Sequence, residues 1–183
     1  MPAYWSSYGP ANFLWLCDAA NFIVAVGLLL ESPLILASQA VSVLVVSLVW
    51  TADVVARLLF GVHPVGGTEY MFDPGRPLAL RLLSLFHVVM PVLLLWLIAR
   101  LGYDRRGWKL QTLIAWTILP LSYLFGTRET NLNWLWRVFG REQTWMDPRL
   151  WLLVAMALYP LVLYLPTHAV LSVWSRRREE RRG

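Results

Sequence analysis

Three side chains that can do covalent chemistry lie inside apolar stretches of this sequence. Cys17 is the only cysteine, and His87 and Asp53 each interrupt a run of leucine and valine. A thiol becomes a useful nucleophile when a base takes its proton and a third group orients that base. The three residue types together are those of an activated cysteine. We therefore predict a catalytic site of Cys17, His87 and Asp53.

The three side chains must lie at one depth for this chemistry. A helix rises ~1.5 Å per residue, which places Cys17 about 8 Å, Asp53 about 10 Å and His87 about 13 Å below the expected outer ends of their helices. The end of a helix that is predicted from a sequence differs from its actual end by up to ~6 Å along the helix axis. The three depths are therefore compatible with one layer below the outer surface.

Each of these residues also has a purely structural explanation. A lone buried cysteine commonly packs as a small apolar side chain. Asp53 lies four residues before Arg57, so the two can pair on one helix face. His87 can serve only as a hydrogen-bond partner of a neighbouring helix. His63 lies in a segment rich in glycine and proline and is expected to be a loop residue, and His168 lies far from this layer.

Metal and cofactor motifs are not recognisable in this chain. Imidazole and carboxylate groups bind zinc, but no two of them here have a spacing such as His-x-x-x-His. No Gly-rich phosphate loop follows a predicted strand, and no serine lies in a nucleophile-elbow pattern. We therefore predict no metal and no cofactor. The residues of ligand type are His63, Glu69, Asp73, Asp53 and His87.

The elements that would position these side chains are membrane-spanning helices. The chain has 183 residues, of which 58% are apolar and 15% charged, and its mean hydropathy is +0.54. These values exclude a disordered chain, a disulfide scaffold and an ordinary soluble enzyme. We predict an all-α bundle in one transmembrane domain, residues 1–175. A span needs ~20 apolar residues. The five expected spans are about 12–30, 34–60, 78–101, 108–125 and 150–174, with a kink at Pro91 in the third.

The distribution of charge predicts the orientation. The net charge is +5, and five arginines lie in the predicted tail, 176–183. Basic residues favour the cytoplasmic side, and the turn 102–107 is also basic. We therefore predict a multi-pass protein of a bacterial plasma membrane with its N-terminus outside and its C-terminus inside. The tail is expected to bind anionic lipid rather than nucleic acid. Residues 1–11 contain no lysine or arginine, so we expect no cleaved signal peptide.

This orientation puts the N-terminal segment and the loops 61–77 and 126–149 on the outer face. Their aromatic rings suit the headgroup layer and predict either an interfacial belt or a lid over a pocket. Amide groups in this region are candidates for contacting a substrate or an oxyanion. The candidate binding residues are Asn21, Asn131, Asn133 and Trp134.

Short motifs in this order resemble the YwaF-like integral membrane proteins over roughly residues 12–165. The motifs are Leu16-Cys17-Asp18, Phe86-His87 and the stretch from Asn131 to Trp136. The family includes an acyltransferase of ether phospholipids that uses a cysteine and a histidine, and is similar in outline to the androgen-induced hydrolases of fatty-acid esters. The resemblance implies that Cys17 is the nucleophile, His87 its base, and Asn131 or Asn133 the counterpart of the family's asparagine.

This chain departs from the family pattern in two ways. The family has six spans, with the cysteine on the second and the histidine on the fourth, whereas here they lie on the first and third. The bundle would then need a homo-oligomer or a partner chain to close. Phe86 replaces the serine that precedes the family's histidine, and Ser84 lies two residues earlier.

Two hypotheses of function follow from these observations. The first is a Cys/His lipid acyltransferase or hydrolase that acts at the outer leaflet on membrane lipids. The second is a non-catalytic binding or assembly subunit that holds a lipid or a partner protein through its outer aromatic loops. A small-solute carrier is less favoured, because five helices without a repeat have no paired halves to move against each other.

Overall fold

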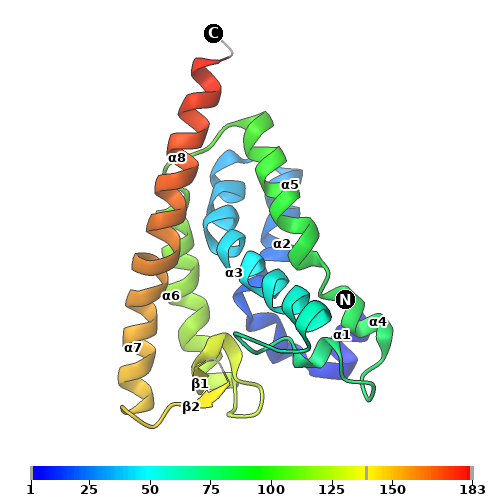
Figure 1. Ribbon diagram of the computed structural model, residues 1–183. Coiled ribbons are helices and arrows are strands. Elements are labelled where there is room, and N and C mark those ends of the chain that lie inside the picture. The colour runs from blue at the N-terminus through cyan, green and yellow to red at the C-terminus, as the bar shows by residue number, and fades with distance from the viewer. Residues whose placement is uncertain (1, 139, 182–183) are drawn as a thin grey trace.

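The computed structural model describes residues 2–138 and 140–181, with side chains from Trp5 onward. The chain is mostly helical, and its irregular loops gather at one end of an elongated bundle (Figure 1). Among the described residues, three helical stretches are long and apolar enough to cross a membrane: Pro33–Phe60, Leu78–Leu101 and Pro148–Glu180. The prediction of an all-α membrane protein is therefore confirmed.

The N-terminal part contains three helical elements before the first long helix. Helix α1 (Pro2–Tyr8) and the 3-10 turn η1 (Pro10–Leu14) precede α2 (Leu16–Leu29). The predicted span 12–30 is thus a shorter α-helix with a 3-10 turn before it. Proline at a first helical position costs no hydrogen bond, and α3 (Pro33–Phe60) begins in this way after the capping residue Ser32.

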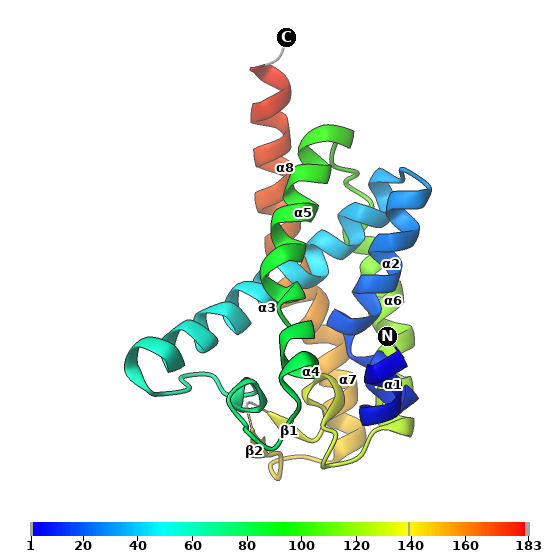
Figure 2. The same cartoon turned by 90° about the vertical axis from the view of Figure 1, so that its right-hand side faces the viewer.

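Helix α3 crosses the bundle obliquely. Figure 2 shows its second half leaving the other helices on one side. A helix of 28 residues is longer than a perpendicular crossing needs, so tilt accommodates its length. Gly61 ends α3 in the left-handed conformation, with a φ of 74° that glycine adopts without a steric penalty. The chain then returns to the bundle through the loop that carries η2 (Glu69–Met71).

The third predicted span is interrupted near its N-terminal end. It consists of α4 (Leu78–Leu83) and α5 (Phe86–Leu101), with Ser84 and Leu85 between them. Pro91, where the sequence predicts a kink, lies inside α5. The interruption falls instead where the chain passes from the outer loop into the bundle.

The remaining helices form the other side of the bundle. Helix α6 (Gly107–Phe125) leads into η3 (Leu132–Trp134) and a short antiparallel pair, β1 (Arg137–Val138) and β2 (Arg141–Glu142), in which Arg137 is opposite Glu142. Helix α7 (Pro148–Leu158), the π-helical turn η4 (Tyr159–Tyr164) and α8 (Leu165–Glu180) follow one another without a break. Most of the predicted tail is thus helical in α8, and Arg182 and Gly183 lie outside the described residues.

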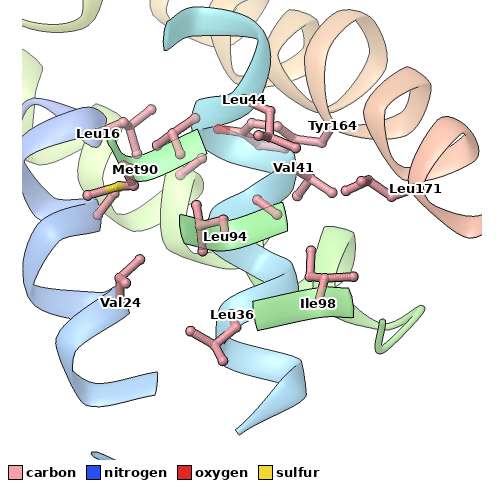
Figure 3. Packing of buried hydrophobic residues seen from close by; sticks show 14 of the residues in the cluster. Leu16, Val24, Leu36, Val41, Leu44, Met90, Leu94, Ile98, Tyr164 and Leu171 are labelled. Atoms are coloured by element: carbon pink, nitrogen blue, oxygen red, sulfur yellow. The ribbon is translucent and has the colours of Figure 1, made fainter. Parts of the chain in front are cut away.

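Helix α3 forms the centre of the core. It packs against α2, α5 and α6, and Figure 3 shows buried side chains of α2, α5 and α8 around it. Gly107 allows the closest approach, because a Cβ atom there would lie 2.7 Å from the Cβ atom of Ala37. A buried polar contact joins the same helices, since Gln39 donates to Gln111 Oε1 at 3.0 Å. These contacts hold the helices that carry the candidate site.

Candidate active site

His87 is held in one orientation at the start of α5. Its Nδ1 atom lies 2.9 Å from the carbonyl oxygen of Ser84, which the interruption before α5 leaves accessible. The imidazole stacks on Trp50 at a centroid distance of 4.7 Å and on Phe86 at 4.1 Å. A histidine that donates from Nδ1 to a carbonyl presents an unprotonated Nε2. The backbone thus does for His87 what the sequence analysis expects an aspartate to do.

Tyr70 connects His87 to the rest of the site. Its hydroxyl accepts a hydrogen bond from Trp50 Nε1 at 3.2 Å. Trp50 and Ser84 are the residues that touch the imidazole of His87. Burial raises the pKa of the Tyr70 hydroxyl to about 12, with smaller increases from the charges of Cys17 and Asp18. Tyr70 therefore stays protonated.

Cys17 and Asp18 occupy the first turn of α2. The carboxylate of Asp18 is buried and accepts a hydrogen bond from Asn12 Nδ2 at 3.0 Å. Leu16, just before Cys17, and Met90, one turn after His87, belong to the same buried cluster in Figure 3. Among the described residues, no hydrogen bond joins Cys17 to His87.

Asn133 anchors the start of α2. Its Oδ1 atom accepts the backbone N–H of Leu16 at 3.0 Å. Its Nδ2 group donates to the carbonyl oxygen of Leu14 at 2.7 Å and to Ser122 Oγ at 2.8 Å. Its own carbonyl oxygen accepts the hydroxyl of Tyr159 at 3.0 Å. Because both ends of the Asn133 amide are occupied, the structure gives it a positioning role for Cys17.

Replacing Asn133 with alanine should destabilise the bundle by about 1–3 kcal/mol, because it leaves the buried N–H of Leu16 without its acceptor. It also removes the hydrogen bonds of the amide to Leu14 and Ser122. The start of α2 should also loosen, so alkylation of Cys17 by a maleimide should become faster. Thermal unfolding in detergent and the alkylation rate measure the two effects. Asn21→Ala is the matched control, since among the described residues Asn21 donates to carbonyl groups of its own helix. Equal stability of the two variants would contradict the anchoring role.

The other predicted binding residues also have structural partners. Asn131 Oδ1 accepts the backbone N–H groups of Trp136 and Arg137, so this side chain closes a turn of the outer loop. Asn21 donates to the carbonyl oxygen of Cys17 at 3.1 Å. The indole of Trp134 packs edge-on against Trp15. A Cβ atom on Gly67 would lie 2.7 Å from the same indole, so the two outer loops pack together here.

Asp53 belongs to a separate cluster that holds the loop after α3. Its carboxylate accepts the backbone N–H groups of Val65 at 2.8 Å and Gly66 at 3.2 Å, and the Thr68 hydroxyl. His63 Nδ1 lies 2.9 Å from the same carboxylate. Among the described residues, no hydrogen bond joins Asp53 to His87. The structure brings Asp53 together with His63 and Thr68 instead.

The alternative that Arg57 neutralises Asp53 is not what the structure shows. The Arg57 guanidinium donates to the carbonyl oxygen of Gly61 and lies over the ring of Phe72. The ion pair of Asp53 is with His63. The carboxylate of Asp53 therefore binds groups of the loop after α3 rather than a side chain of its own helix.

The described residues contain no group of three or more histidine, cysteine, aspartate or glutamate side chains arranged to hold a metal ion. His168 lies at the other end of the bundle, where its Nδ1 atom is 2.9 Å from the hydroxyl of Tyr103.

Sequence reasoning missed Tyr70 and Trp50 as members of the site. It did single out Ser84, which precedes His87 by three residues on the same predicted helix, and in the structure the Ser84 carbonyl contacts His87. Trp50 and Tyr70 resembled the many other rings of this chain. Their role depends on how the loop after α3 folds back onto α5.

Comparison with protein-family models, with curated proteins and with solved structures finds no match for this chain. The chemistry of the site is therefore inferred from its own geometry.

Proposed function

We propose that this chain is a five-span membrane protein that carries out lipid acyl transfer or hydrolysis at the outer leaflet, with Cys17 as nucleophile and His87 as base. The observation that carries the proposal is the position of Tyr70. Its hydrogen-bond partner Trp50 stacks on His87, and the Asp18 carboxyl next to Cys17 is among the groups that raise the pKa of its hydroxyl. The Tyr70 hydroxyl thus lies beside the indole that holds the imidazole.

The arrangement of the helices supports the proposed topology. Figure 1 shows the turn between α5 and α6 at the same end as the C-terminus of α8, and the β1–β2 pair at the opposite end. The first end carries the basic residues of the turn and of α8, which favours the cytoplasmic side of a plasma membrane. The candidate site lies toward the other end, which supports action at the outer leaflet.

The proposed reaction begins with proton transfer. A buried thiol must give its proton to a neighbouring base, and the carboxylate of Asp18 disfavours a second negative charge nearby. The proton therefore passes to His87 Nε2 as the sulfur attacks the ester carbonyl. Tyr70 is placed to donate a hydrogen bond to the oxyanion. The C–O bond of the ester breaks, and the alcohol leaves with the proton from His87.

The second half regenerates the enzyme. Water or the hydroxyl of another lipid loses its proton to His87 and attacks the thioester carbonyl. The C–S bond breaks, and the thiolate of Cys17 takes the proton back. Water would give a free fatty acid, and a lipid hydroxyl would give a new ester. The resemblance to the YwaF-like family agrees with this chemistry.

The test is a search for the thioester. Detergent-purified protein incubated with phospholipid and quenched in acid should carry a hydroxylamine-labile acyl adduct on Cys17 by intact-protein mass spectrometry. Cys17→Ala should carry none, because the attacking sulfur is missing. Lipid cleavage at an equal rate in wild type and Cys17→Ala would contradict the proposal.

The alternative is a non-catalytic binding or assembly subunit. It is favoured by the exposure of Trp5 and Trp145 at the loop end, which are 58% and 57% exposed. Exposed tryptophans at this level suit the headgroup layer or a partner protein. The adduct experiment separates the two functions, since a binding subunit would form no thioester.

A further inference from the structure

We infer that Arg81, assisted by Arg76, binds a phosphate group at the outer mouth of the bundle. Arg81 lies on α4, in the first turn of the pass Leu78–Leu101. Its Nη1 group donates to the carbonyl oxygen of Met71 at 2.9 Å. Its Nε atom is buried and has no hydrogen-bond partner in the part of the chain that the structure describes. Nor does any acidic side chain pair with it there.

An arginine in this position is expected to bind an anion. A guanidinium group has five N–H donors and a permanent charge. Among the described residues, the one acceptor that hydrogen-bonds to Arg81 is the carbonyl oxygen of Met71. Arg81 lies about 5 Å below the start of its helix, which is the depth of the headgroup layer. An arginine near the end of a membrane-spanning helix can extend its guanidinium into the headgroup layer, where lipid phosphates lie.

Arg76 is held beside the same turn, η2. Its guanidinium lies 5.7 Å from the ring centre of Tyr8 and 5.9 Å from that of Tyr70. Nη1 donates to the Tyr8 hydroxyl at 3.3 Å and Nε to Asp73 Oδ2 at 3.3 Å. The hydrogen bond with Tyr8, foremost, raises the pKa of Arg76. Arg76 is thus a fixed cation whose neighbour Tyr70 borders the candidate site.

The nearby carboxylates do not compensate Arg81. Asp73 pairs with Arg76 and accepts the backbone N–H of Gly75 at 2.9 Å. Glu69 accepts the backbone N–H of Gly67 at 2.7 Å. Both are exposed carboxylates that close turns. Among the described residues, neither of these carboxylates pairs with Arg81.

Phosphate is the ligand class that fits this arrangement. It offers several acceptor oxygens, and the fork of an arginine matches them with two parallel hydrogen bonds. The group can come from a lipid headgroup or from free phosphate. A headgroup held here would place its acyl esters below the surface, beside Tyr70. The binding itself does not rest on the proposed chemistry at Cys17.

The test is native mass spectrometry of the full chain in an uncharged detergent. Phosphatidylglycerol should remain bound to one site, whereas a phosphate-free glucosyl diacylglycerol should not. Arg81→Gln should weaken phosphatidylglycerol binding by about 10–100-fold, because a charge-assisted hydrogen bond is lost. Arg149→Gln is the matched control, since Arg149 is exposed in the first turn of α7. A titration with inorganic phosphate shows whether the free anion competes for the site.

Each outcome of this experiment decides something. Equal retention of the two lipids, or wild-type affinity in Arg81→Gln, overturns the site. Competition by millimolar phosphate supports the site with the free anion as its source, and lack of competition supports it with a headgroup as its source. If Arg81→Gln fails to fold, Arg81→Lys keeps the charge without the fork and should bind several-fold more weakly. Cys17→Ala should keep full phosphatidylglycerol binding, so a missing thioester and a missing phosphate site are separate failures.

Discussion

Substitution of His87 by glutamine is expected to slow formation of the acyl adduct on Cys17 by about 10²–10⁴-fold, the contribution of a general base. Glutamine is polar and can still donate to the carbonyl oxygen of Ser84, which now accepts from His87 Nδ1 at 2.9 Å. It cannot take a proton from a thiol. The loss of stacking on Trp50 should cost about 0.5–1.5 kcal/mol of stability. Time-resolved mass spectrometry of the adduct measures the rate.

The control for this prediction is the histidine at the opposite end of the bundle. His168→Gln changes a hydrogen bond to Tyr103 and should leave the rate of adduct formation unchanged. Thermal unfolding of both variants shows that the bundle persists. If His87→Gln acylates at the wild-type rate, His87 is only a stacking partner of Trp50.

The long helices could be predicted from the sequence, because the length of an apolar run determines whether it can form a membrane-spanning helix. The long apolar runs ending near Phe60 and Leu101 form helices in the structure. The interruption at Ser84 and Leu85 carries neither glycine nor proline, so no local signal marks it. It arises where α4 joins the outer loop to α5, and it exposes the carbonyl group that orients His87.

The partners of the polar residues could not be anticipated in the same way. Asn133 looked like a substrate contact because an amide near an outer aromatic loop suits that role. In the structure its partners, Leu14 and Leu16, lie more than 100 residues earlier in the chain. Asp53 was linked to His87 by depth, but its partners come from the loop that follows its own helix. The depth of a residue in its helix predicts the layer of the bundle in which it lies. Its hydrogen-bond partners depend on the conformation of the loops.

The conformation of the loop after α3 depends on glycines, and the pattern of apolar residues in the sequence does not predict it. Gly66 and Gly67 have φ angles of 84°, in the left-handed region that favours glycine. This conformation lets the backbone N–H of Gly66 reach the carboxylate of Asp53. Tyr70 then follows in the turn η2, and this places its hydroxyl beside Trp50. The candidate site therefore depends on the loop that Asp53 holds.

Removal of the Asp53 carboxylate is consequently expected to have the largest effect on stability. Asp53→Ala should lower the free energy of unfolding by about 3–5 kcal/mol. The substitution leaves hydrogen-bond donors of the loop without their acceptor and removes the contact between the carboxylate and His63. The donors are the N–H groups of Val65 and Gly66 and the Thr68 hydroxyl. Denaturant unfolding in mixed micelles measures the loss, and limited proteolysis should cut the loop 61–71 sooner than in wild type.

Two further variants make this result specific. Glu69→Ala removes an exposed carboxylate from the same loop, which accepts the backbone N–H of Gly67, and should cost less than about 1 kcal/mol. Asp53→Asn keeps one acceptor oxygen but turns an amide toward the Thr68 hydroxyl, so its stability should be intermediate. In this series the rate of adduct formation on Cys17 should decrease as the loop 61–71 becomes less ordered. A full loss of the adduct in Asp53→Asn with wild-type stability would instead assign Asp53 a direct catalytic role beside His87.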